Sequence, residues 1–360
     1  MIVKADNYST KKTKILMCGS DLSVKGGIVS VVKNHLSYRD WSPYEIRYIP
    51  THVDSSRFKV AAVFAAGWLK VVVAALSGRY KVLYLHTAER GSFFRKAILA
   101  WTIKALGMKI VMHHHAAEFE EFYAGLPDGA KRFVNKTLEK VDLNLVLSER
   151  LVDMITSKAP AANVKVLYNA VQTYEANLYD QDANYILFLG RIGKRKGAYD
   201  LLEAIKQLDS VIDAKYKFLL CGDGEVDQVR ELAEEYGLRD RIIHIGWIEG
   251  QQKAEFLSRT MINVLPSYHE GLPMTILETM ALGIPNISTP VASIPEVIED
   301  GINGLLVEPG DVEQLAAAIK RLCEDCDLRM AISDQAWKEI VERFSLDIHV
   351  SKLKEYLEEM

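Results

Sequence analysis

The feature that most constrains the fold of this chain is a repeated alternation of short apolar runs with longer amphipathic stretches. Each short run is followed by glycine, proline or polar residues, as at the carboxyl ends of buried parallel strands. The runs are residues 14–18, 82–85, 110–112 and 143–147 in the first half, and 185–189, 217–221, 242–245, 262–265, 286–288 and 304–307 in the second. Strands that alternate with helices predict an α/β protein with parallel sheets that are covered by helices on both faces.

The series of strands restarts after the polar stretch 172–184, which indicates two domains. A chain of 360 residues is long enough for two, since one domain typically has about 100–200 residues. We therefore predict a Rossmann-like domain over residues 1–167 and a second one over residues 168–344. A C-terminal helix over residues 345–360 is expected to pack back on the first domain.

The net charge of −4 conceals a strong difference between the two halves. Residues 1–167 contain 25 lysines and arginines against 14 aspartates and glutamates, whereas residues 168–360 contain 19 against 34. A basic first half favours a partner with phosphate groups, such as an anionic lipid surface or a phospholipid-linked acceptor. The alternative is an ordinary solvated surface. We expect no nucleic-acid partner.

Two apolar segments of the first half favour contact with a membrane. Residues 60–76 are the longest apolar run, interrupted by Lys70, and fall short of the roughly 20 residues that a membrane span needs. Residues 90–109 are basic and rich in aromatic and aliphatic side chains. Together they predict a cationic amphipathic face on anionic lipid, although two ordinary sheet-covering helices would give the same pattern.

The sparse use of cysteine indicates a reducing compartment. The chain has four cysteines, fewer than the disulfide framework of a small secreted domain would need. Residues 1–14 are polar and contain several lysines, without the apolar core of a signal peptide. We therefore expect a cytoplasmic protein that is held peripherally at the inner face of the cytoplasmic membrane.

The loops after the predicted strands are the candidate sites, because open parallel sheets bind ligands at the carboxyl ends of their strands. The first loop covers residues 19–27 and ends in Gly26-Gly27, directly before a helical pattern over 28–36. Glycines let the backbone approach a ligand, and a helix N-terminus favours an anion. Gly26 and Gly27 are therefore candidates for a diphosphate contact. An ordinary turn is equally open, since the spacing is not that of the dinucleotide fingerprint.

The second loop, Gly190-Arg191-Ile-Gly-Lys-Arg-Lys196-Gly197, places four cations within six residues directly after a strand. Like charges in a tight loop repel one another, and an anion would neutralise them. Arg191 can grip phosphate oxygens as a fork, and Lys196 can act as a mobile point charge. This favours phosphate binding over a solvated basic loop.

The third loop is Glu270-Gly-Leu-Pro273-Met-Thr-Ile-Leu-Glu278. Pro273 suits the first turn of a helix, whose N–H groups would offer another anion site. A carboxylate at Glu278, about a turn and a half into that helix, would accept the two hydroxyl hydrogens of a ribose. Glu270 has a structural alternative, which is a charge stabilised by the helix dipole.

Taken together, these motifs resemble glycosyltransferase family 4. The resemblance rests on Gly190-Arg191 with Lys196-Gly197, on Glu270-Gly271-Leu272-Pro273 with Glu278, and on residues 294–307, and it is densest over residues 164–344. It implies a retaining glycosyltransferase of the bacterial surface-polysaccharide type with a GT-B fold, in which two Rossmann-like, doubly wound parallel-sheet domains face each other across a cleft. It also implies no required metal and no other cofactor.

The resemblance assigns roles to the loop residues. Arg191 and Lys196 would stabilise the leaving diphosphate, Glu270 would contact the transferred sugar, and Glu278 would hold the ribose. The remaining residues implied in donor binding are Gly26, Gly27, Gly190, Gly271, Leu272, Met274 and Thr275. Fixed cations and helix N-termini would do the work of a metal by stabilising negative charge as it develops.

A histidine stretch, His113-His-His115, follows a predicted strand of the first domain. Alternate residues of a strand share a face, so His113 and His115 point together; they would suit a metal, but no third ligand is evident. The stretch is similar to the H-x-H-G segment of bacterial polysaccharide glycosyltransferases, which places His115 near the transferred sugar. Ala116 replaces the usual glycine here, and Ala170 and Ala292 are also alanines where the family commonly has glycine.

The resemblance therefore predicts transfer of a hexose-type sugar from a nucleotide diphosphate donor, with a UDP-sugar favoured and GDP-mannose second. The acceptor would be a polyprenyl-diphosphate-linked saccharide in capsule, O-antigen, lipopolysaccharide or exopolysaccharide synthesis. Two other classes stay open. One is a nucleotide-sugar epimerase on a similar fold, and the other is a non-catalytic nucleotide-sugar-binding protein.

Overall fold

The computed structural model describes residues 12–360, which divide into two compact units. The first unit contains the described residues up to Leu167 together with Leu353–Met360, and the second is Tyr168–Lys352. Helix α13 (Leu346–Glu358) begins in the second unit and ends in the first. Most of the N-terminal stretch that bears on a signal peptide lies outside the described residues.

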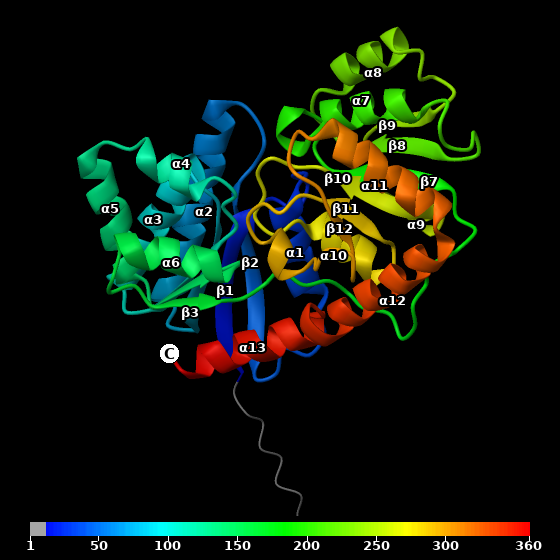
Figure 1. The fold of residues 1–360 in the computed structure, drawn as a ribbon. Helices are drawn as coiled ribbons and strands as arrows, with labels where there is room; N and C mark the ends of the chain where they lie inside the picture. The colour runs from blue at the N-terminus through cyan, green and yellow to red at the C-terminus, as the bar shows by residue number, and fades with distance from the viewer. Residues whose placement is uncertain (1–11) are drawn as a thin grey trace, which may run out of the picture. The chain divides into compact units, whose positions relative to one another are not determined.

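The first unit is built on a parallel sheet with the strand order β2-β1-β3-β4-β5-β6. In Figure 1 its strands β1 and β2 lie side by side in blue. Because β2 and β3 lie on opposite sides of β1, right-handed connections place helices on both faces. The strands are β1 (Thr13–Ser20), β2 (Tyr44–His52), β3 (Tyr80–Thr87), β4 (Lys109–His114), β5 (Leu143–Val146) and β6 (Val164–Val166). The helices are α1 (Gly27–Ser37), α2 (Arg57–Leu76), α3 (Gly91–Lys104), α4 (Phe119–Ala124), α5 (Asp128–Lys140) and α6 (Glu149–Lys158).

The sequence predicted the four central strands of this sheet and missed both edge strands. β2 alternates buried and exposed residues, so it has no continuous apolar run. β6 has only three residues, of which one is buried. A search for continuous apolar runs finds strands that are covered on both faces, and edge strands do not meet that condition.

Helix α2 packs on the sheet along one side and is exposed along the other. Its buried residues include Gly67 and Val71, and a Cβ atom at Gly67 would lie 2.8 Å from the carbonyl oxygen of Pro50 in β2. The helix has 20 residues, so the expectation that this segment is too short for a membrane span was wrong. Within residues 12–360 it is the single helix that is long and apolar enough to cross a membrane. Of its most apolar stretch of 18 residues, 22% is buried.

The second unit contains another six-stranded parallel sheet, in the order β12-β11-β10-β7-β8-β9. The strands are β7 (Tyr185–Leu189), β8 (Lys217–Cys221), β9 (Ile242–Gly246), β10 (Thr260–Leu265), β11 (Asn286–Ser288) and β12 (Leu305–Leu306). All six predicted strands of this half are confirmed. The strand order reverses between β7 and β10, and such a switch point is where doubly wound sheets bind ligands.

Helices and short 3₁₀ turns connect these strands. They are η1 (Lys194–Lys196), α7 (Ala198–Leu208), α8 (Val226–Glu235), α9 (Gly250–Ser258), α10 (Met274–Ala281), η2 (Ile294–Glu296), α11 (Val312–Glu324) and α12 (Cys326–Arg343). Pro273 is the residue before α10, not part of its first turn as predicted. Both units are thus Rossmann-like, and the predicted α/β class is confirmed.

Candidate active site

The loops that follow β7, β8 and β10 approach one another so closely that glycine is required. A Cβ atom at Gly222 would lie 1.8 Å from the carbonyl oxygen of Gly190, the first residue after β7. Gly197 has a φ of 71°, and its Cβ atom would lie 2.1 Å from the carbonyl oxygen of Pro266. No other residue type fits such contacts. The cationic turn after β7 is therefore packed directly on the loop after β10.

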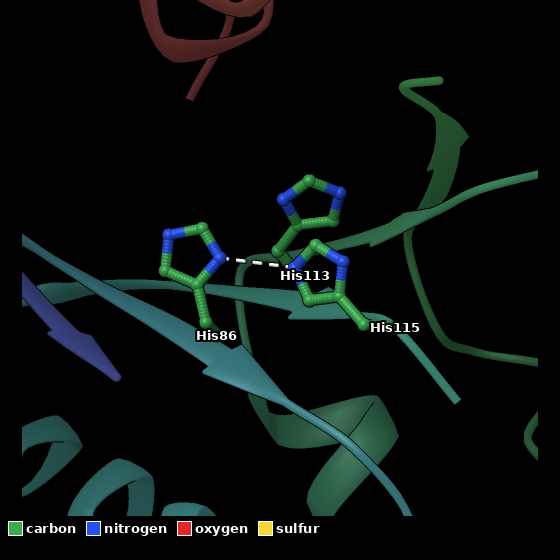
Figure 2. Close-up of side chains that lie close together, drawn as sticks. All are labelled: His86, His113 and His115. Atoms are coloured by element: carbon green, nitrogen blue, oxygen red, sulfur yellow. Dashed lines mark hydrogen bonds between the residues drawn. The ribbon is translucent and has the colours of Figure 1, made fainter. Parts of the chain in front are cut away.

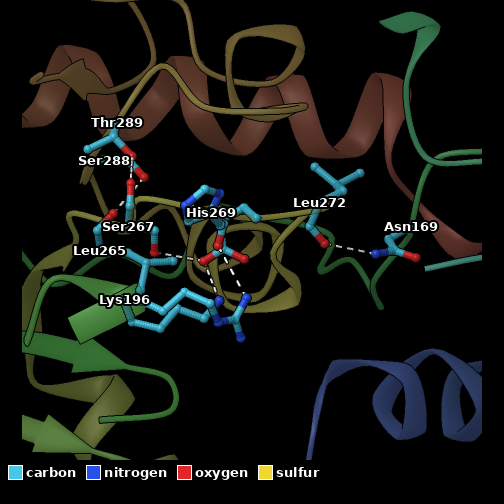
Figure 3. A network of polar contacts seen from close by, with 10 residues as sticks. Asn169, Lys196, Leu265, Ser267, His269, Leu272, Ser288 and Thr289 are labelled. Atoms are coloured by element: carbon cyan, nitrogen blue, oxygen red, sulfur yellow. Dashed lines mark hydrogen bonds and ion pairs between the residues drawn. The ribbon is translucent and has the colours of Figure 1, made fainter. Parts of the chain in front are cut away.

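At this contact Lys196 forms an ion pair with Glu270 (Figure 3). The Glu270 side chain is 5% exposed and that of Lys196 is 14% exposed. Ser267 also donates a hydrogen bond of 2.7 Å to the same carboxylate. Burial lowers the pKa of Lys196, and the Glu270 charge opposes that shift. A buried carboxylate needs a cation or hydrogen-bond donors to offset the water it has lost, and Lys196 and Ser267 provide both to Glu270.

The loop that carries Glu270 is also held by two hydrogen bonds from neighbouring hydroxyl groups. Thr289 donates from its hydroxyl to the carbonyl oxygen of Ser267 at 2.6 Å, and Ser288 donates likewise to Leu265 at 2.8 Å. Both hydroxyls come from the end of β11, and both side chains are fully buried. Figure 3 shows these contacts on the side of the loop away from Lys196. The carboxylate is therefore rigidly positioned by the adjoining strands.

Two of the other three cations of the turn, Arg191 and Arg195, also have protein partners. Arg191 pairs with Asp223 at 3.0 Å, and Arg195 donates to the carbonyl oxygen of His269 at 3.3 Å. The repulsion inferred from the sequence is thus relieved within the protein, which weakens the argument that an anion is needed to neutralise the turn. Arg191 is still 64% exposed, so its guanidinium can exchange Asp223 for another anion at low cost.

Glu278 lies in α10 and pairs with Lys253 of α9 at 2.7 Å. The residues before it, Gly271 and Leu272, form the entry to α10, and Met274 and Thr275 are its first two residues. Asn169 donates to the carbonyl oxygen of Leu272 at 2.8 Å and so fixes this entry. The first amides of a helix have no intrahelical acceptor, and α10 begins four residues after Glu270 in the loop that follows β10.

In the first unit, Gly26 and Gly27 stand where the sequence predicted a helix N-terminus. Gly26 is the residue before α1 and has a φ of 135°, and Gly27 is the first residue of the helix. Both residues are exposed. Their role in binding a diphosphate stays a prediction.

His115 follows β4 in the first unit and has two histidine neighbours (Figure 2). Its ring centroid lies 4.2 Å from that of His113 and 5.2 Å from that of His86 at the end of β3. The expected common direction of His113 and His115 is thus confirmed, whereas the expectation that no third ligand stands nearby was wrong. His86 comes from a different strand, so no spacing within residues 113–115 could have revealed it.

A family comparison bears directly on the second unit, in which the charged residues gather. Residues 172–339 match the family described as glycosyl transferases group 1. The matched segment is just under half of the chain. The group 1 segment contains β7 to β12 and, with them, Arg191, Lys196, Glu270 and Glu278.

Individual relatives agree with the group 1 assignment. The lipopolysaccharide core biosynthesis glycosyltransferase LpsE of Rhizobium meliloti is 36% identical over 165 residues, which are 46% of this chain and 46% of LpsE. The alignment thus spans about half of the length of that relative. An uncharacterized 41.2 kDa protein in the cps region of Klebsiella pneumoniae is 24% identical over 81% of this chain and 86% of its own length.

Solved structures match nearly the full length of the chain. Anabaena HepE, solved in complex with UDP and glucose, superposes with a TM-score of 0.75 over 97% of this chain and 100% of its own, at 18% identity. At that identity the likeness shows the fold alone, which is GT-B.

The group 1 segment also contains polar residues that the sequence did not indicate. Ser267, Thr289, Asp223 and Lys253 each contact a predicted site residue or its loop. Serine, threonine and single charges are common in loops, so residue type alone did not distinguish them. Of these four residues, only Asp223 could have been identified from the sequence, because it follows β8 at the same sheet edge as Arg191.

Proposed function

We propose that this protein is a retaining glycosyltransferase that moves a hexose-type sugar from a nucleotide diphosphate to a lipid-linked saccharide, without a required metal. The observation that carries the proposal is the buried Lys196–Glu270 pair beside the switch point of a group 1 segment. A UDP-sugar is the favoured donor and GDP-mannose the second, and the UDP and glucose in the HepE complex support this order. LpsE and the cps-region protein support a surface-polysaccharide acceptor.

In this proposal the diphosphate lies between the cationic turn and the first turn of α10. Arg191 exchanges Asp223 for phosphate oxygens, and the α10 amides donate to the same group. Lys196 stabilises the negative charge that grows as the bond from sugar to phosphate breaks, and fixed charges of this kind usually make the greatest contribution to catalysis. Glu270 faces the sugar. Glu278 gives up its ion pair with Lys253 and accepts hydrogen bonds from the ribose hydroxyls.

Donor binding and the role of Glu270 are tested together. Purified protein is screened by thermal shift against UDP, UDP-sugars and GDP-mannose, because a ligand stabilises the folded state in proportion to its affinity. Glu270→Gln keeps the shape of the side chain and removes its charge. We expect transfer to fall by about 100-fold or more. Glu235→Gln, an exposed change at the end of α8, is the matched control and should leave transfer unchanged.

Each alternative class has its own outcome in this experiment. Conversion of the donor to an isomer without acceptor would establish an epimerase, and tight donor binding without turnover on any acceptor would establish a binding protein. A Glu270→Gln protein that transfers at the wild-type rate would remove Glu270 from the proposed chemistry.

We also propose that the exposed side of α2 lies on the cytoplasmic membrane surface. Phe58, Leu69, Val73 and Leu76 are between 57% and 90% exposed there. The helix contains Arg57, Lys59 and Lys70 but no acidic residue. An apolar face accompanied only by cations suits the interface of an anionic bilayer.

Vesicle sedimentation tests this surface. Leu69→Asp with Val73→Asp should greatly reduce binding to vesicles rich in phosphatidylglycerol, and high salt should weaken the binding of the wild type. Val211→Asp, at a 47% exposed valine of the second unit, is the control. Equal binding of both variants would refute the surface, and a wild type that is released only by detergent would point instead to a span.

A further inference from the structure

The three histidines of the first unit are brought together by the register of two neighbouring strands. β3 and β4 pair in parallel with His86 opposite His113. Paired residues of adjacent strands point to the same face about 5 Å apart. His115 follows two residues later and shares that face. The cluster therefore lies at the carboxyl ends of β3 and β4, the edge at which such sheets bind ligands.

The ring nitrogens of the three residues converge. One ring nitrogen from each lies within 4.8 Å of those from the other two. Nδ1 of His86 and Nε2 of His115 are 2.9 Å apart and share a hydrogen bond. Figure 2 shows the rings gathered on one side of the two strands. The three nitrogens are therefore close enough together to contact one ion.

The orientation of the His113 ring is fixed by a hydrogen bond at its Nδ1 atom. Its Nδ1 lies 2.8 Å from the hydroxyl of Tyr84, which is fully buried in β3. When Nδ1–H donates to that hydroxyl oxygen, Nε2 is the ring nitrogen of His113 that carries the lone pair. Metal-binding histidines commonly have such a partner on the nitrogen that does not bind the metal.

We propose that His86, His113 and His115 form a binding site for one divalent transition-metal ion, with Zn²⁺ the best-suited common ion. Three imidazoles without a carboxylate are a donor set for Zn²⁺, Cu²⁺ and Ni²⁺, and do not suit Mg²⁺ or Ca²⁺. Three histidines also leave a fourth tetrahedral position for water or another ligand. The partly exposed ring of His115 gives the ion a path from solvent.

Binding needs only small side-chain movements. Zn–N bonds of about 2.0–2.1 Å place tetrahedral nitrogens about 3.4 Å apart. The three nitrogens lie within 4.8 Å of one another, so no pair has to close by more than about 1.4 Å. The pair His86 and His115 holds one proton between its facing nitrogens. When an ion binds to both nitrogens, that proton moves to the other nitrogen of the same ring, so both rings stay neutral and no proton is released.

This site is separate from the diphosphate chemistry proposed for the second unit. The one link is His115, to which the family resemblance assigns a role toward the transferred sugar, so a bound ion would compete with that role. Metal binding is measured without donor or acceptor, and its outcome is therefore independent of the glycosyltransferase proposal.

The test uses full-length protein that has been freed of metal by chelation. Zn²⁺ is titrated by calorimetry and by competition with a chromogenic chelator, and Co²⁺ is added separately to record its visible absorption. We expect one Zn²⁺ per chain with micromolar or tighter affinity, and a Co²⁺ spectrum with the intensity of four-coordinate nitrogen ligation. Wild-type protein that binds no Zn²⁺ in this range would overturn the proposal.

Variants locate the ion. His86→Asn and His113→Asn should each weaken Zn²⁺ binding at least 100-fold, and Tyr84→Phe should weaken it about 10-fold by releasing His113. His244→Asn in β9 is the matched control. Thermal denaturation without metal checks that each variant folds. Zn²⁺ should stabilise the wild type and the control fully and Tyr84→Phe less, and should stabilise His86→Asn and His113→Asn least. Undiminished Zn²⁺ binding by folded His86→Asn protein would overturn the site.

Discussion

The two units place different chemistry at the same edge of similar sheets. In the second unit, the ends of β7 and β10 carry opposite charges that pair with each other, as Lys196 does with Glu270. In the first unit, the ends of β3 and β4 carry histidine rings that stack and share hydrogen bonds. The comparison shows that a candidate site made of charged loops can be predicted from the sequence. A cluster of rings from two strands cannot, because the register of the two strands decides which rings become neighbours.

The largest expected effect separates two lysines of the same turn. Lys196→Met should lower transfer by about 100-fold or more, because it removes a buried cation and leaves Glu270 without its ion pair. Lys194→Met, at an exposed lysine two residues earlier, should change transfer by less than about threefold, since exposed charges contribute little. Steady-state rates with a donor identified by thermal shift measure both. Equal losses would mean that the turn acts only through its total charge.

The next effect concerns the one fully buried lysine among the described residues of the first unit. Lys96 is 1% exposed, and burial lowers its pKa to about 8. The unfolded chain keeps this proton up to a pH of about 10.5, so the wild type gains stability as the pH rises from 8 towards 10.5. Between pH 7 and pH 10 the wild type should gain about 2.5 kcal/mol of unfolding free energy relative to Lys96→Met.

Urea denaturation of both proteins at the two pH values measures this gain. A gain of this size would show that burying the charged Lys96 lowers the unfolding free energy of the first unit at neutral pH, and that this loss disappears when the lysine is deprotonated at high pH. An unchanged difference between wild type and variant would show that water or a counter-charge keeps Lys96 fully protonated.

The second unit should show a pH dependence of the same sign in the acid range, through His349. A ring nitrogen of this side chain in α13 lies 2.7 Å from the carbonyl oxygen of Tyr168, and burial lowers the pKa of His349 to about 4. Between pH 6.5 and pH 4 the unfolded chain takes up a proton that the folded chain does not, so stability falls as the pH falls. From pH 7 to pH 5 the wild type should lose about 2 kcal/mol relative to His349→Gln. Urea denaturation at both pH values measures this loss, and parallel losses in the two proteins would contradict the assignment to His349.

The smallest effect tests an alanine that stands where the resembled family commonly has glycine. Ala292 has a φ of 49°, a left-handed conformation that disfavours a Cβ atom. Ala292→Gly should therefore raise the unfolding free energy by up to about 1 kcal/mol. Ala317→Gly, in the middle of α11 and exposed, should lower it by about 1 kcal/mol. Thermal melts of the two variants should shift in opposite directions, and shifts of the same sign would remove the argument from strain.

The sequence by itself determined the α/β class, all the central strands of both sheets and the charged loops after β7 and β10. These features are local, because a buried strand appears as a short apolar run and a loop cation is visible by residue type. Tertiary structure alone decided that the half-exposed segments β2 and β6 are edge strands. It also decided that Lys196 pairs with Glu270, 74 residues away, and that His86 stands beside His113 and His115. Such partners are chosen by strand order and register, and no local spacing records which strands become neighbours.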